Sequence, residues 1–439
     1  MRPGVNRRSF LKSTAAAGAA LGVRAAEGAA PDSVNAAIIG AGVQGQALLN
    51  ACLKLGRVRI KALCDIWADY NLVNASRILD KHKHEHATYT ELGELLAAER
   101  GLDAAIIATP DCCHAPQAVA CLEAGLHVYC ESPMATTVEG ARSMARAARQ
   151  AGRLLQVGFQ RRSDARYIHC ADKLLREVKL LGRISAARAE WNRPVQAERG
   201  FPRRAPLSEE VLAKHGYGSM QRFRNWEWYR DLGGGPLAAL SSHQLDALAW
   251  LLDARPVRIM AAGGVDYYDP ETHRWPDTVL AVLDYDGPRG RLRASLQLLN
   301  ANGYLGSQER LLGDQGAIIL SEGRGRTEIY REQTALDWDR WIGLGLLEKP
   351  AREGAEEEAG GRGTGVTESV RPPVYYLPDF PQEPPFAAHL ANFFDAIRGG
   401  AALRGGPEAG FAAVVAVAKI MTAVETGAPV ACAPEEWKA

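Results

Sequence analysis

Apolar and polar residues alternate in two different ways along this chain, and the pattern changes near Gln160. From Val34 to about Gly158, short apolar runs alternate with amphipathic stretches whose apolar residues recur at helical spacing. The runs that predict strands are 35–39, 59–64, 104–108, 127–130 and 154–158. Strands that alternate with helices predict a parallel, doubly wound α/β sheet.

After Gln160 the runs become longer, and apolar residues alternate with polar ones, as in strands with one buried face. These runs span 184–191, 257–265, 278–285, 291–299 and 317–321, and helical stretches occur at 236–252, 385–398 and 406–426. We expect an open, mainly antiparallel sheet covered by the helices at 236–252 and 385–398. This α+β domain, at 161–439, would cap the carboxyl edge of a first domain at 31–160. Residues 349–373, rich in Gly, Glu, Arg and Pro, predict a flexible loop.

The first predicted strand leads directly into a glycine loop. The loop reads Gly40-Ala41-Gly42-Val43-Gln44-Gly45, and Asp65 follows twenty residues later at the end of the second strand. The first glycine allows a tight turn, the second lets the backbone approach a pyrophosphate, and the third lets helix and strand pack closely. A carboxylate at Asp65 accepts hydrogen bonds from ribose hydroxyls and repels a 2′-phosphate. The motif predicts a Rossmann domain that binds NAD in preference to NADP.

The N-terminus is expected to lie outside the fold. Arg7-Arg8 is followed by Ser9-Phe10-Leu11 and by a small, weakly apolar run at 13–23. This pattern is typical of a twin-arginine export signal, here residues 1–30, with cleavage between 24 and 30. The run is too short and too rich in Ala and Gly to anchor the chain in a bilayer. We expect a periplasmic protein that is exported folded, holds NAD tightly and has no membrane contact after cleavage.

Composition argues against other functions. The chain has 52 Lys and Arg against 51 Asp and Glu, a net charge of +1, and so shows no basic excess that would indicate nucleic-acid binding. The 8 cysteines are not spaced as a disulfide framework or a zinc site, and buried free thiols are expected. His82, His84 and His86 alternate with charged residues, which indicates a solvated face, so we predict no metal site.

Further motifs follow the predicted strands and helices. The third strand leads into Ala108-Thr109-Pro110 and His114, the fourth into Tyr129-Cys130-Glu131-Ser132-Pro133-Met134, and the fifth into Gly158-Phe159-Gln160-Arg161-Arg162. Later come Gly233-Gly234-Gly235, His243-Gln244-Leu245-Asp246 and the helix at 386–399. With the glycine loop, these motifs resemble the Gfo/Idh/MocA oxidoreductases, the group of glucose-fructose oxidoreductase and inositol dehydrogenase. The resemblance extends from Val34 to the C-terminus except for the loop at 349–373.

The resemblance implies an enzyme that oxidises a CH–OH group of a sugar or sugar derivative, as a homodimer or homotetramer paired through the outer face of the second sheet. It assigns His243 as the acid/base, and imidazole suits this role because loss of a hydride from an alcohol carbon also requires loss of the hydroxyl proton. The cofactor contacts that it implies are Thr109, Pro110 and His114 at the nicotinamide, Glu131 at the ribose, and Gln160 and Arg161 towards cofactor and substrate.

The chain departs from the family pattern at two positions. Where the family has Glu-Lys-Pro, this chain has Glu131-Ser132-Pro133, and where many members have an aspartate four residues before the histidine, it has Ala239. Each lost acid/base group is typically worth about 10²–10⁴ in rate. Ser132 and His243 are therefore expected to belong to an altered catalytic site.

Three explanations of this altered site stay open. Another group can replace the lysine; the candidates in the loop before the glycines are Lys214, Tyr217, Tyr229 and Asp231, of which Tyr229 and Asp231 are the preferred catalytic partners. Alternatively, NAD is used transiently in a glycoside hydrolase or lyase with no net redox change. Finally, the chain binds nucleotide or sugar without turnover. The aromatic segment 223–230, with Trp191, suits stacking against sugar rings in any of the three.

Overall fold

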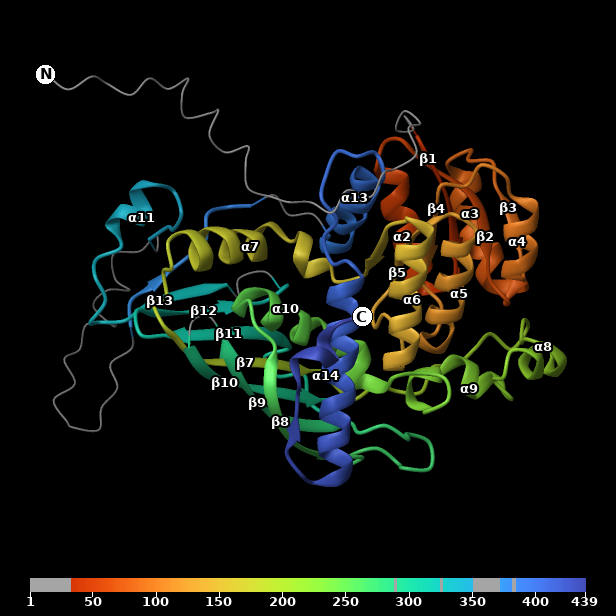
Figure 1. Cartoon of the computed structure of the whole chain (residues 1–439). Coiled ribbons are helices and arrows are strands. Elements are labelled where there is room, and N and C mark those ends of the chain that lie inside the picture. Colours follow the sequence, from red (N-terminus) through yellow and green to blue (C-terminus); the bar gives the residue numbers. More distant parts are fainter. Residues whose placement is uncertain (1–32, 288–289, 324–326, 350–371, 381–383) are drawn as a thin grey trace, which may run out of the picture. The chain divides into compact units, whose positions relative to one another are not determined.

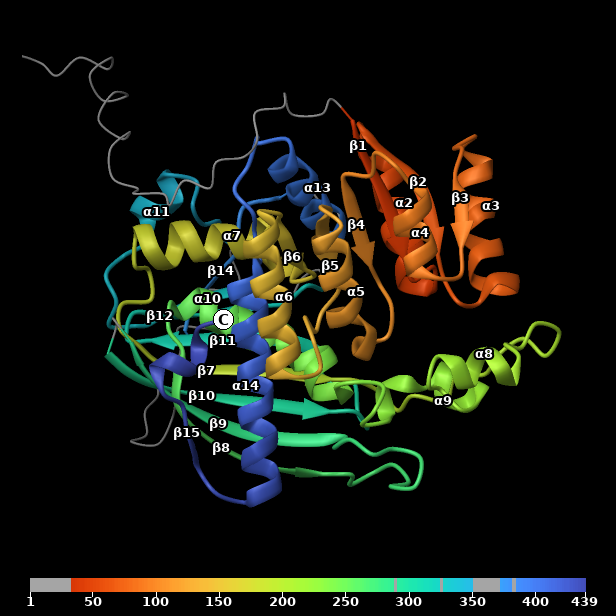
Figure 2. The ribbon, with the colours of Figure 1, turned by 45° about the vertical axis from the view of Figure 1, so that its right-hand side comes forward.

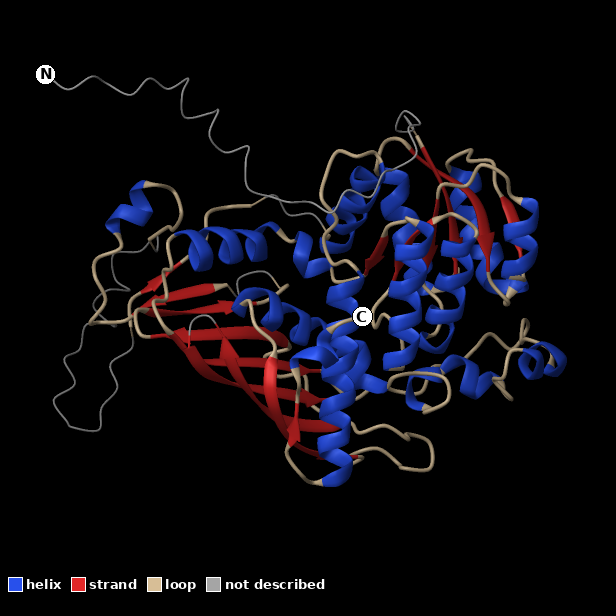
Figure 3. Cartoon of the chain, in the orientation of Figure 1, coloured by secondary structure: helices blue, strands red, loops and turns tan. Residues whose placement is uncertain are grey.

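The computed structural model describes residues 33–287, 290–323, 327–349, 372–380 and 384–439. These residues form two sheets with helices packed against them (Figure 1, Figure 3). The predicted export signal at 1–30 and most of the predicted loop at 349–373 lie outside the described residues.

The first sheet is parallel and has six strands in the order β3-β2-β1-β4-β5-β6. The predicted doubly wound sheet is confirmed. The structure adds β3, a three-residue edge strand that is too short to produce an apolar run. The strands are β1 (Val34–Ile39), β2 (Val58–Cys64), β3 (Ala87–Tyr89), β4 (Ala104–Ile107), β5 (His127–Cys130) and β6 (Leu155–Val157).

Helices cover both faces of this sheet because successive side chains of a strand point to opposite sides. In β1, Ala36 and Ile38 pack in one core with Phe393, whereas Ala37 and Ile39 pack in the other. The first core contains α2 (Val43–Lys54), α3 (Val73–Lys81) and α13 (Pro385–Ile397); the second contains α4 (Leu92–Ala98), α5 (Asp111–Glu123), α6 (Val138–Ala151) and part of α14 (Pro407–Thr426).

The second sheet has nine strands in the order β14-β13-β12-β11-β7-β10-β9-β8-β15. Its neighbouring strands are antiparallel except β7 and β10, which are parallel, so the predicted mainly antiparallel sheet is confirmed. The strands are β7 (Ile184–Asn192), β8 (Pro256–Gly264), β9 (Thr278–Gly287), β10 (Gly290–Leu299), β11 (Ser307–Gly313), β12 (Gly316–Leu320), β13 (Glu328–Arg331), β14 (Val374–Tyr375) and β15 (Val430–Ala431).

One face of the second sheet carries helices, and the other is open. The covered face packs against α7 (Ala165–Ile168), its π-helical continuation to Glu177, and α10 (Ser242–Leu252), as Figure 2 shows. The prediction that the helix at 385–398 also covers this sheet is wrong, because Phe393 and Phe394 of α13 pack in the core of the first sheet. An amphipathic pattern indicates that a helix has a buried face but not which sheet covers it.

The helix α14 is long and apolar enough to cross a membrane by length and composition. In this fold it is a core helix, because it packs against α6, α10 and β8. Its apolar side chains are therefore explained by contacts within the protein.

The chain between β7 and α10 forms an arm with two short helices, α8 (Glu209–Lys214) and α9 (Met220–Arg224). The arm packs against the first sheet through Trp67, whose indole N–H donates to the carbonyl of Ala205 at 2.7 Å and whose ring meets Phe223 at 5.6 Å. It therefore connects the sheet-bearing second half to the carboxyl end of β2.

Candidate active site

The glycine loop between β1 and α2 leaves space where a pyrophosphate would bind. Gly40 has a φ of +89°, and a Cβ there would lie 2.6 Å from the carbonyl carbon of Ala108. A Cβ on Gly45 would lie 1.9 Å from the Gly40 oxygen, whereas a Cβ on Gly42 would meet only the Asn71 amide, at 3.8 Å. Packing thus requires glycine at positions 40 and 45. Gly42 instead faces open space at the start of α2, and backbone N–H groups at a helix start are typical binding groups for phosphate oxygens.

Asp65 ties this loop to the end of β2. Its carboxylate accepts hydrogen bonds from the backbone N–H groups of Ala41 and Trp67, both at 2.8 Å, and from the Asn71 amide at 3.1 Å. Burial raises the pKa of Asp65 to about 6, although these hydrogen bonds oppose the increase. The predicted contact between Asp65 and a ribose stays a prediction.

The glycine loop also meets the turn that follows β5. Val43, the first residue of α2, is 84% exposed, and Gln44 donates from Nε2 to Glu131 Oε1 at 2.8 Å. Burial raises the pKa of Glu131 to about 7. A Cβ on Gly158 would lie 2.3 Å from Glu131 Oε2, so the glycine after β6 is needed to admit this carboxylate.

His114 connects two turns at the carboxyl edge of the first sheet. Its Nδ1 lies 2.8 Å from the Pro133 carbonyl, and its Nε2 lies 2.9 Å from the Thr109 carbonyl. Pro110, which follows Thr109, is the N-cap residue of α5. The side chain is buried and both ring nitrogens face protein oxygens. The structure therefore gives His114 a role in positioning the turns that were predicted to line the nicotinamide.

Ser132 and His243 form a hydrogen-bonded pair between the two halves of the protein. Ser132 Oγ lies 2.8 Å from His243 Nε2, and the His243 ring stands between Phe159 at 5.7 Å and Trp191 at 5.8 Å. Burial, with a smaller contribution from the positive charge of Arg161, lowers the pKa of His243 to about 4. The ring is therefore neutral at pH 7, with Nε2 able to accept the serine proton.

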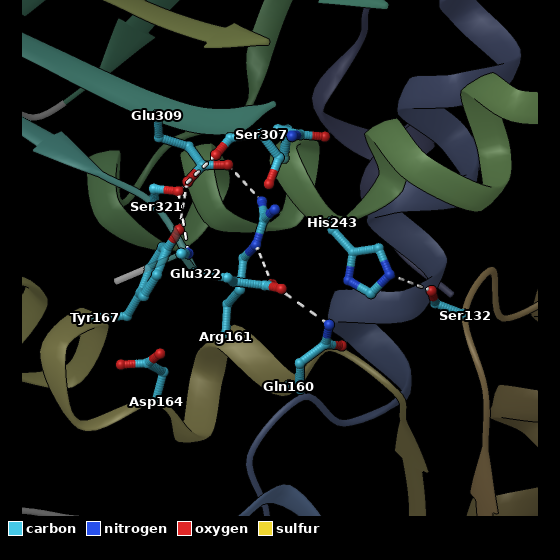
Figure 4. Close-up of polar contacts among 12 residues, drawn as sticks. Ser132, Gln160, Arg161, Asp164, Tyr167, His243, Ser307, Glu309, Ser321 and Glu322 are labelled. Atoms are coloured by element: carbon cyan, nitrogen blue, oxygen red, sulfur yellow. Dashed lines mark hydrogen bonds and ion pairs between the residues drawn. The ribbon is translucent and has the colours of Figure 1, made fainter. Parts of the chain in front are cut away.

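Arg161 lies beside this pair in a buried group of charges (Figure 4). Its Nε donates to Glu322 at 2.7 Å, its Nη1 pairs with Glu309, and Tyr167 donates to Glu309 at 2.6 Å. Gln160 donates to the same Glu322 oxygen at 3.3 Å. Burial alone would raise the pKa of Glu322, but the Arg161 charge holds it below its usual value. The predicted residues Gln160 and Arg161 thus bind carboxylates of the second half of the chain.

Figure 4 shows the His243 ring between Ser132 on one side and Gln160 with Glu322 on the other. His243 Nδ1 is buried and has no hydrogen-bond partner. Glu322 raises the pKa of His243, in opposition to burial and Arg161, so the carboxylate favours the protonated ring. The sequence did not indicate Glu322 or Glu309, because no motif surrounds either residue. Phe159 belongs to the motif at 158–162 that follows the fifth predicted strand.

Tyr229 and Asp231, predicted as catalytic partners, have other contacts. Asp231 forms an ion pair with Arg222, whose guanidinium also lies 4.5 Å from the centre of the Tyr229 ring. Both line a surface cavity with Glu271 and Arg274. The side chains that lie against His243 include Ser132, Phe159 and Trp191, and neither Tyr229 nor Asp231 has a hydrogen bond, ion pair or ring contact with it among those described.

The other candidates in the arm are also engaged elsewhere. Lys214 pairs with Glu91, and the Tyr217 hydroxyl lies 4.0 Å from the sulfur of Cys113. Trp228 of the aromatic segment is buried and meets His273 at 4.2 Å, as a core residue does. Its buried position favours the interpretation that this residue anchors the fold.

Among the described residues, no group of three or more His, Cys, Asp and Glu is arranged to hold a metal ion. The eight cysteines are free thiols, and six of them are buried. His84 is partly buried and accepts a hydrogen bond from the Ile60 N–H at 2.9 Å, so this histidine is less solvated than its sequence pattern indicated.

Comparison with known proteins identifies the two halves. Residues 34–159 match the oxidoreductase family with an NAD-binding Rossmann fold, and residues 173–319 match the Gfo/Idh/MocA C-terminal domain. Residues 4–23 match the twin-arginine translocation signal sequence. The inositol 2-dehydrogenase/D-chiro-inositol 3-dehydrogenase of Shouchella clausii is 33% identical over 342 residues, which cover 73% of this chain and 86% of that protein.

Solved structures share the fold. Aldose-aldose oxidoreductase from Caulobacter crescentus, complexed with glycerol, superposes with a TM-score of 0.67 at 19% identity, covering 91% of this chain and 100% of that one. The WlbA dehydrogenase from Bordetella pertussis, in complex with NADH and UDP-GlcNAcA, gives 0.65 at 19% identity, covering 91% and 98%. The chain is a member of the Gfo/Idh/MocA family, an NAD-dependent oxidoreductase of the sugar-dehydrogenase type with a twin-arginine signal sequence.

Proposed function

We propose that this protein is a periplasmic dehydrogenase that oxidises a secondary hydroxyl of a cyclic polyol or sugar, with Ser132 and His243 managing the proton. The observation that carries the proposal is the 2.8 Å contact between Ser132 Oγ and His243 Nε2, at the position where the family pattern has a lysine. A cyclic polyol is favoured because the Shouchella relative carries the name of an inositol dehydrogenase.

The residues at the carboxyl edge of the first sheet fit NAD. The open face at Gly42 and the start of α2 suit the pyrophosphate, and the Asp65 carboxylate suits the adenosine ribose. Thr109, Pro110 and Glu131 belong to the turns that would hold the nicotinamide half. When bound, NAD supplies the acceptor for the hydride that leaves the substrate carbon.

The serine and the histidine provide a path for the hydroxyl proton. Ser132 Oγ accepts the proton of the substrate hydroxyl and passes its own proton to His243 Nε2, so the alcohol loses one proton and one hydride and becomes a ketone. His243 is ready to accept because its lowered pKa keeps the ring neutral at pH 7. Such proton transfer is typically worth about 10²–10⁴ in rate.

Glu322 favours the charged ring that this transfer produces. The low pKa of His243 makes a protonated ring costly in its buried position. The Glu322 carboxylate raises the pKa of His243, and Arg161 in turn keeps this carboxylate ionised. We infer that Glu322 supplies the negative charge which the family pattern places four residues before the histidine, where this chain has Ala239.

The open face of the second sheet supports the predicted homo-oligomer. Leu280 is 54% exposed, Val282 37% and Leu312 43%, on the side away from the helices. Leu280 and Val282 lie side by side on β9, whereas Leu312 lies on β11, with β10 and β7 between the two strands. An exposed apolar cluster such as the pair on β9 commonly marks a protein interface. We propose that two copies pair through this face.

The dehydrogenase proposal is tested with the mature protein. Bound nucleotide is released by denaturation and identified, and myo-inositol, other cyclic polyols, free sugars and aryl glycosides are then supplied with NAD. We expect NAD in the protein and an increase in NADH absorbance with at least one cyclic polyol or sugar.

Two outcomes would contradict this expectation. Release of aglycone from an aryl glycoside without net NADH would favour the hydrolase or lyase alternative. Bound NAD without any product would favour a binding protein.

A second experiment tests the NAD site. Asp65→Ala should weaken NAD binding by about 10- to 100-fold, because a hydrogen bond to a charged group is worth about 1.5–3 kcal/mol. Since the pKa of Asp65 is raised to about 6, the native carboxylate is ionised at pH 7 and becomes protonated as the pH falls below 6. The native Kd for NAD, measured by calorimetry, should therefore increase by up to about tenfold for each pH unit below 6.

The control for this experiment is Asp69→Asn, which changes an exposed carboxylate nearby. It should leave the Kd and its pH dependence unchanged. Equal retention of NAD by Asp65→Ala would contradict the assignment of the ribose contact.

A further inference from the structure

The arm between β7 and α10 lies along the carboxyl edge of the first sheet. After β2, the Trp67 indole N–H donates to the carbonyl of Ala205 in the arm at 2.7 Å. At the start of α5, which follows β4, the Cys112 N–H donates to the Leu232 carbonyl at 3.3 Å. An open α/β sheet binds its ligand outside the carboxyl ends of its strands. The arm is therefore attached at the edge of the sheet where a nucleotide binds.

A small apolar cluster holds the arm in this place. The ion pair between Lys214 of α8 and Glu91, which follows β3, contributes little, because its side chains are 58% and 33% exposed. In the cluster, Trp67 comes from the loop after β2 and its buried partners come from the arm. The buried members are Trp67, Leu212, Tyr217, Met220, Phe223 and Leu232. Docking of the arm therefore depends mainly on these side chains and on the Trp67 hydrogen bond.

Trp67 joins the arm to the carboxylate that we assign to the NAD ribose. Asp65 accepts a hydrogen bond from the Trp67 backbone N–H and another from Ala41 in the glycine loop, both at 2.8 Å. Trp67 is 1% exposed, and its indole N–H binds the arm. A path of direct contacts therefore runs from the glycine loop through Asp65 and Trp67 to the arm. Release of the arm would expose Trp67 and free the loop that orients Asp65.

The arm also brings Tyr217 to the same end of the sheet. The Tyr217 hydroxyl lies 4.0 Å from the sulfur of Cys113, in the first turn of α5. Burial, the neighbouring cysteines and the charge of Asp65 raise the pKa of Tyr217, so the hydroxyl stays protonated at pH 7. One side chain of the arm thus lies near both α5 and the carboxylate beside which the adenosine half of NAD would bind.

We propose that the arm is a further part of the NAD site, a clasp that fixes its adenosine end. The docked arm holds Trp67, and through it Asp65, in the position that receives the ribose. NAD bound at Asp65 in turn stabilises the docked arm, because coupling between two equilibria is reciprocal. Trp67 is a positioning residue in this device. The proposal concerns the binding of NAD alone, and it rests on the assignment of Asp65 to the ribose.

The first test weakens the clasp without changing a residue next to Asp65. Leu212→Ala removes a side chain that is 4% exposed in the arm cluster. Loss of a buried leucine from so small a cluster should release the arm in most molecules. The apparent Kd for NAD increases in inverse proportion to the docked fraction, so we expect an increase of about tenfold or more by calorimetry on the mature, nucleotide-free protein.

The matched control is Leu347→Ala. Leu347 is 1% exposed and belongs to the core of the second sheet, so its loss removes the same side chain from a site outside the clasp. It should leave the Kd for NAD unchanged. The double variant Leu212→Ala/Phe223→Ala ensures that the arm is released, and neither residue belongs to the cores of the two sheets.

The second test measures the reciprocal effect in the native protein. Saturating NAD should slow hydrogen exchange of the arm amides at 205–232 by about the factor through which release of the arm raises the Kd. The amides of β9 and β10 should exchange at the same rate with and without NAD. An arm with a purely structural role would be protected equally in both states.

Three outcomes would overturn the clasp. They are a native Kd in the double variant although its arm amides exchange freely, an equal increase in Kd in Leu347→Ala, and arm exchange that NAD leaves unchanged. These measurements use no substrate, so they are separate from a failure of the dehydrogenase proposal. Loss of NAD binding in Asp65→Ala beside a native Kd in the double variant would keep the ribose contact and overturn the clasp alone.

Discussion

His243→Gln should lower kcat/KM for the polyol by about 10²–10⁴ while the Kd for NAD stays the same. The glutamine amide can still contact Ser132, but it cannot take up the proton that the native Nε2 receives at 2.8 Å. Steady-state rates and calorimetric titration with NAD measure the two quantities. A variant that loses NAD binding together with activity would indicate a structural role for His243.

The proton path can be tested separately from the histidine. If Ser132 passes its proton to His243, Ser132→Ala should lower kcat/KM substantially, and the double variant with His243→Gln should lose little more than His243→Gln alone. Residues that act as a unit have strongly non-additive effects. Additive losses would place Ser132 outside the path. Trp191→Phe, which keeps an aromatic ring beside His243, serves as the matched control and should retain most of the activity.

Arg161→Met should lower the free energy of unfolding by about 3–5 kcal/mol, because it leaves the fully buried Glu309 without its cation and also removes a partner of the partly exposed Glu322. Urea unfolding at pH 7 measures this loss. Arg161 holds the pKa of Glu322 below its ordinary value of 4.5. The part of the free energy of unfolding that comes from the Arg161–Glu322 pair is therefore fully present above pH 4.5 and is lost as the pH falls further. The difference between native and variant proteins should therefore shrink at low pH.

Arg166→Met is the control for this prediction. Arg166 pairs with Asp164, but its side chain is 22% exposed, so water replaces part of the lost interaction. Its effect should be clearly smaller than that of Arg161→Met. Adding Glu309→Gln to Arg161→Met should restore part of the stability, since it removes one of the two uncompensated carboxylates. Equal effects of the two arginine variants would contradict the special role of the buried group.

The fold was predictable where local pattern determines structure. The runs at 35–39 and 59–64 became β1 and β2, because apolar runs between glycine turns and amphipathic helices favour a parallel sheet whatever surrounds them. Short edge strands were missed, because β3 and β14 contain only three and two residues and make no periodic pattern. The helix α13 was placed on the wrong sheet, since its apolar face by itself does not name its partner.

The candidate site likewise contains residues that the sequence predicted and contacts that it did not. Gly40 and Gly45 follow from sequence because they belong to a motif of short, fixed spacing, and the structure shows that close backbone packing requires glycine at both positions. The sequence placed Ser132 and His243 in one site, but it did not predict their contact, since they lie 111 positions apart. The preferred candidates, Tyr229 and Asp231, have partners in the arm instead.

By itself, the sequence determined the family, the NAD-binding loop, the export signal and the loss of the usual lysine at Ser132. These depend on residue types at short, fixed spacings. Only the tertiary structure decided that Ser132 contacts His243, and that Glu322 and Arg161 set the charge around that histidine. Each of these facts depends on residues from distant segments, which the packing of the two sheets brings together and removes from water.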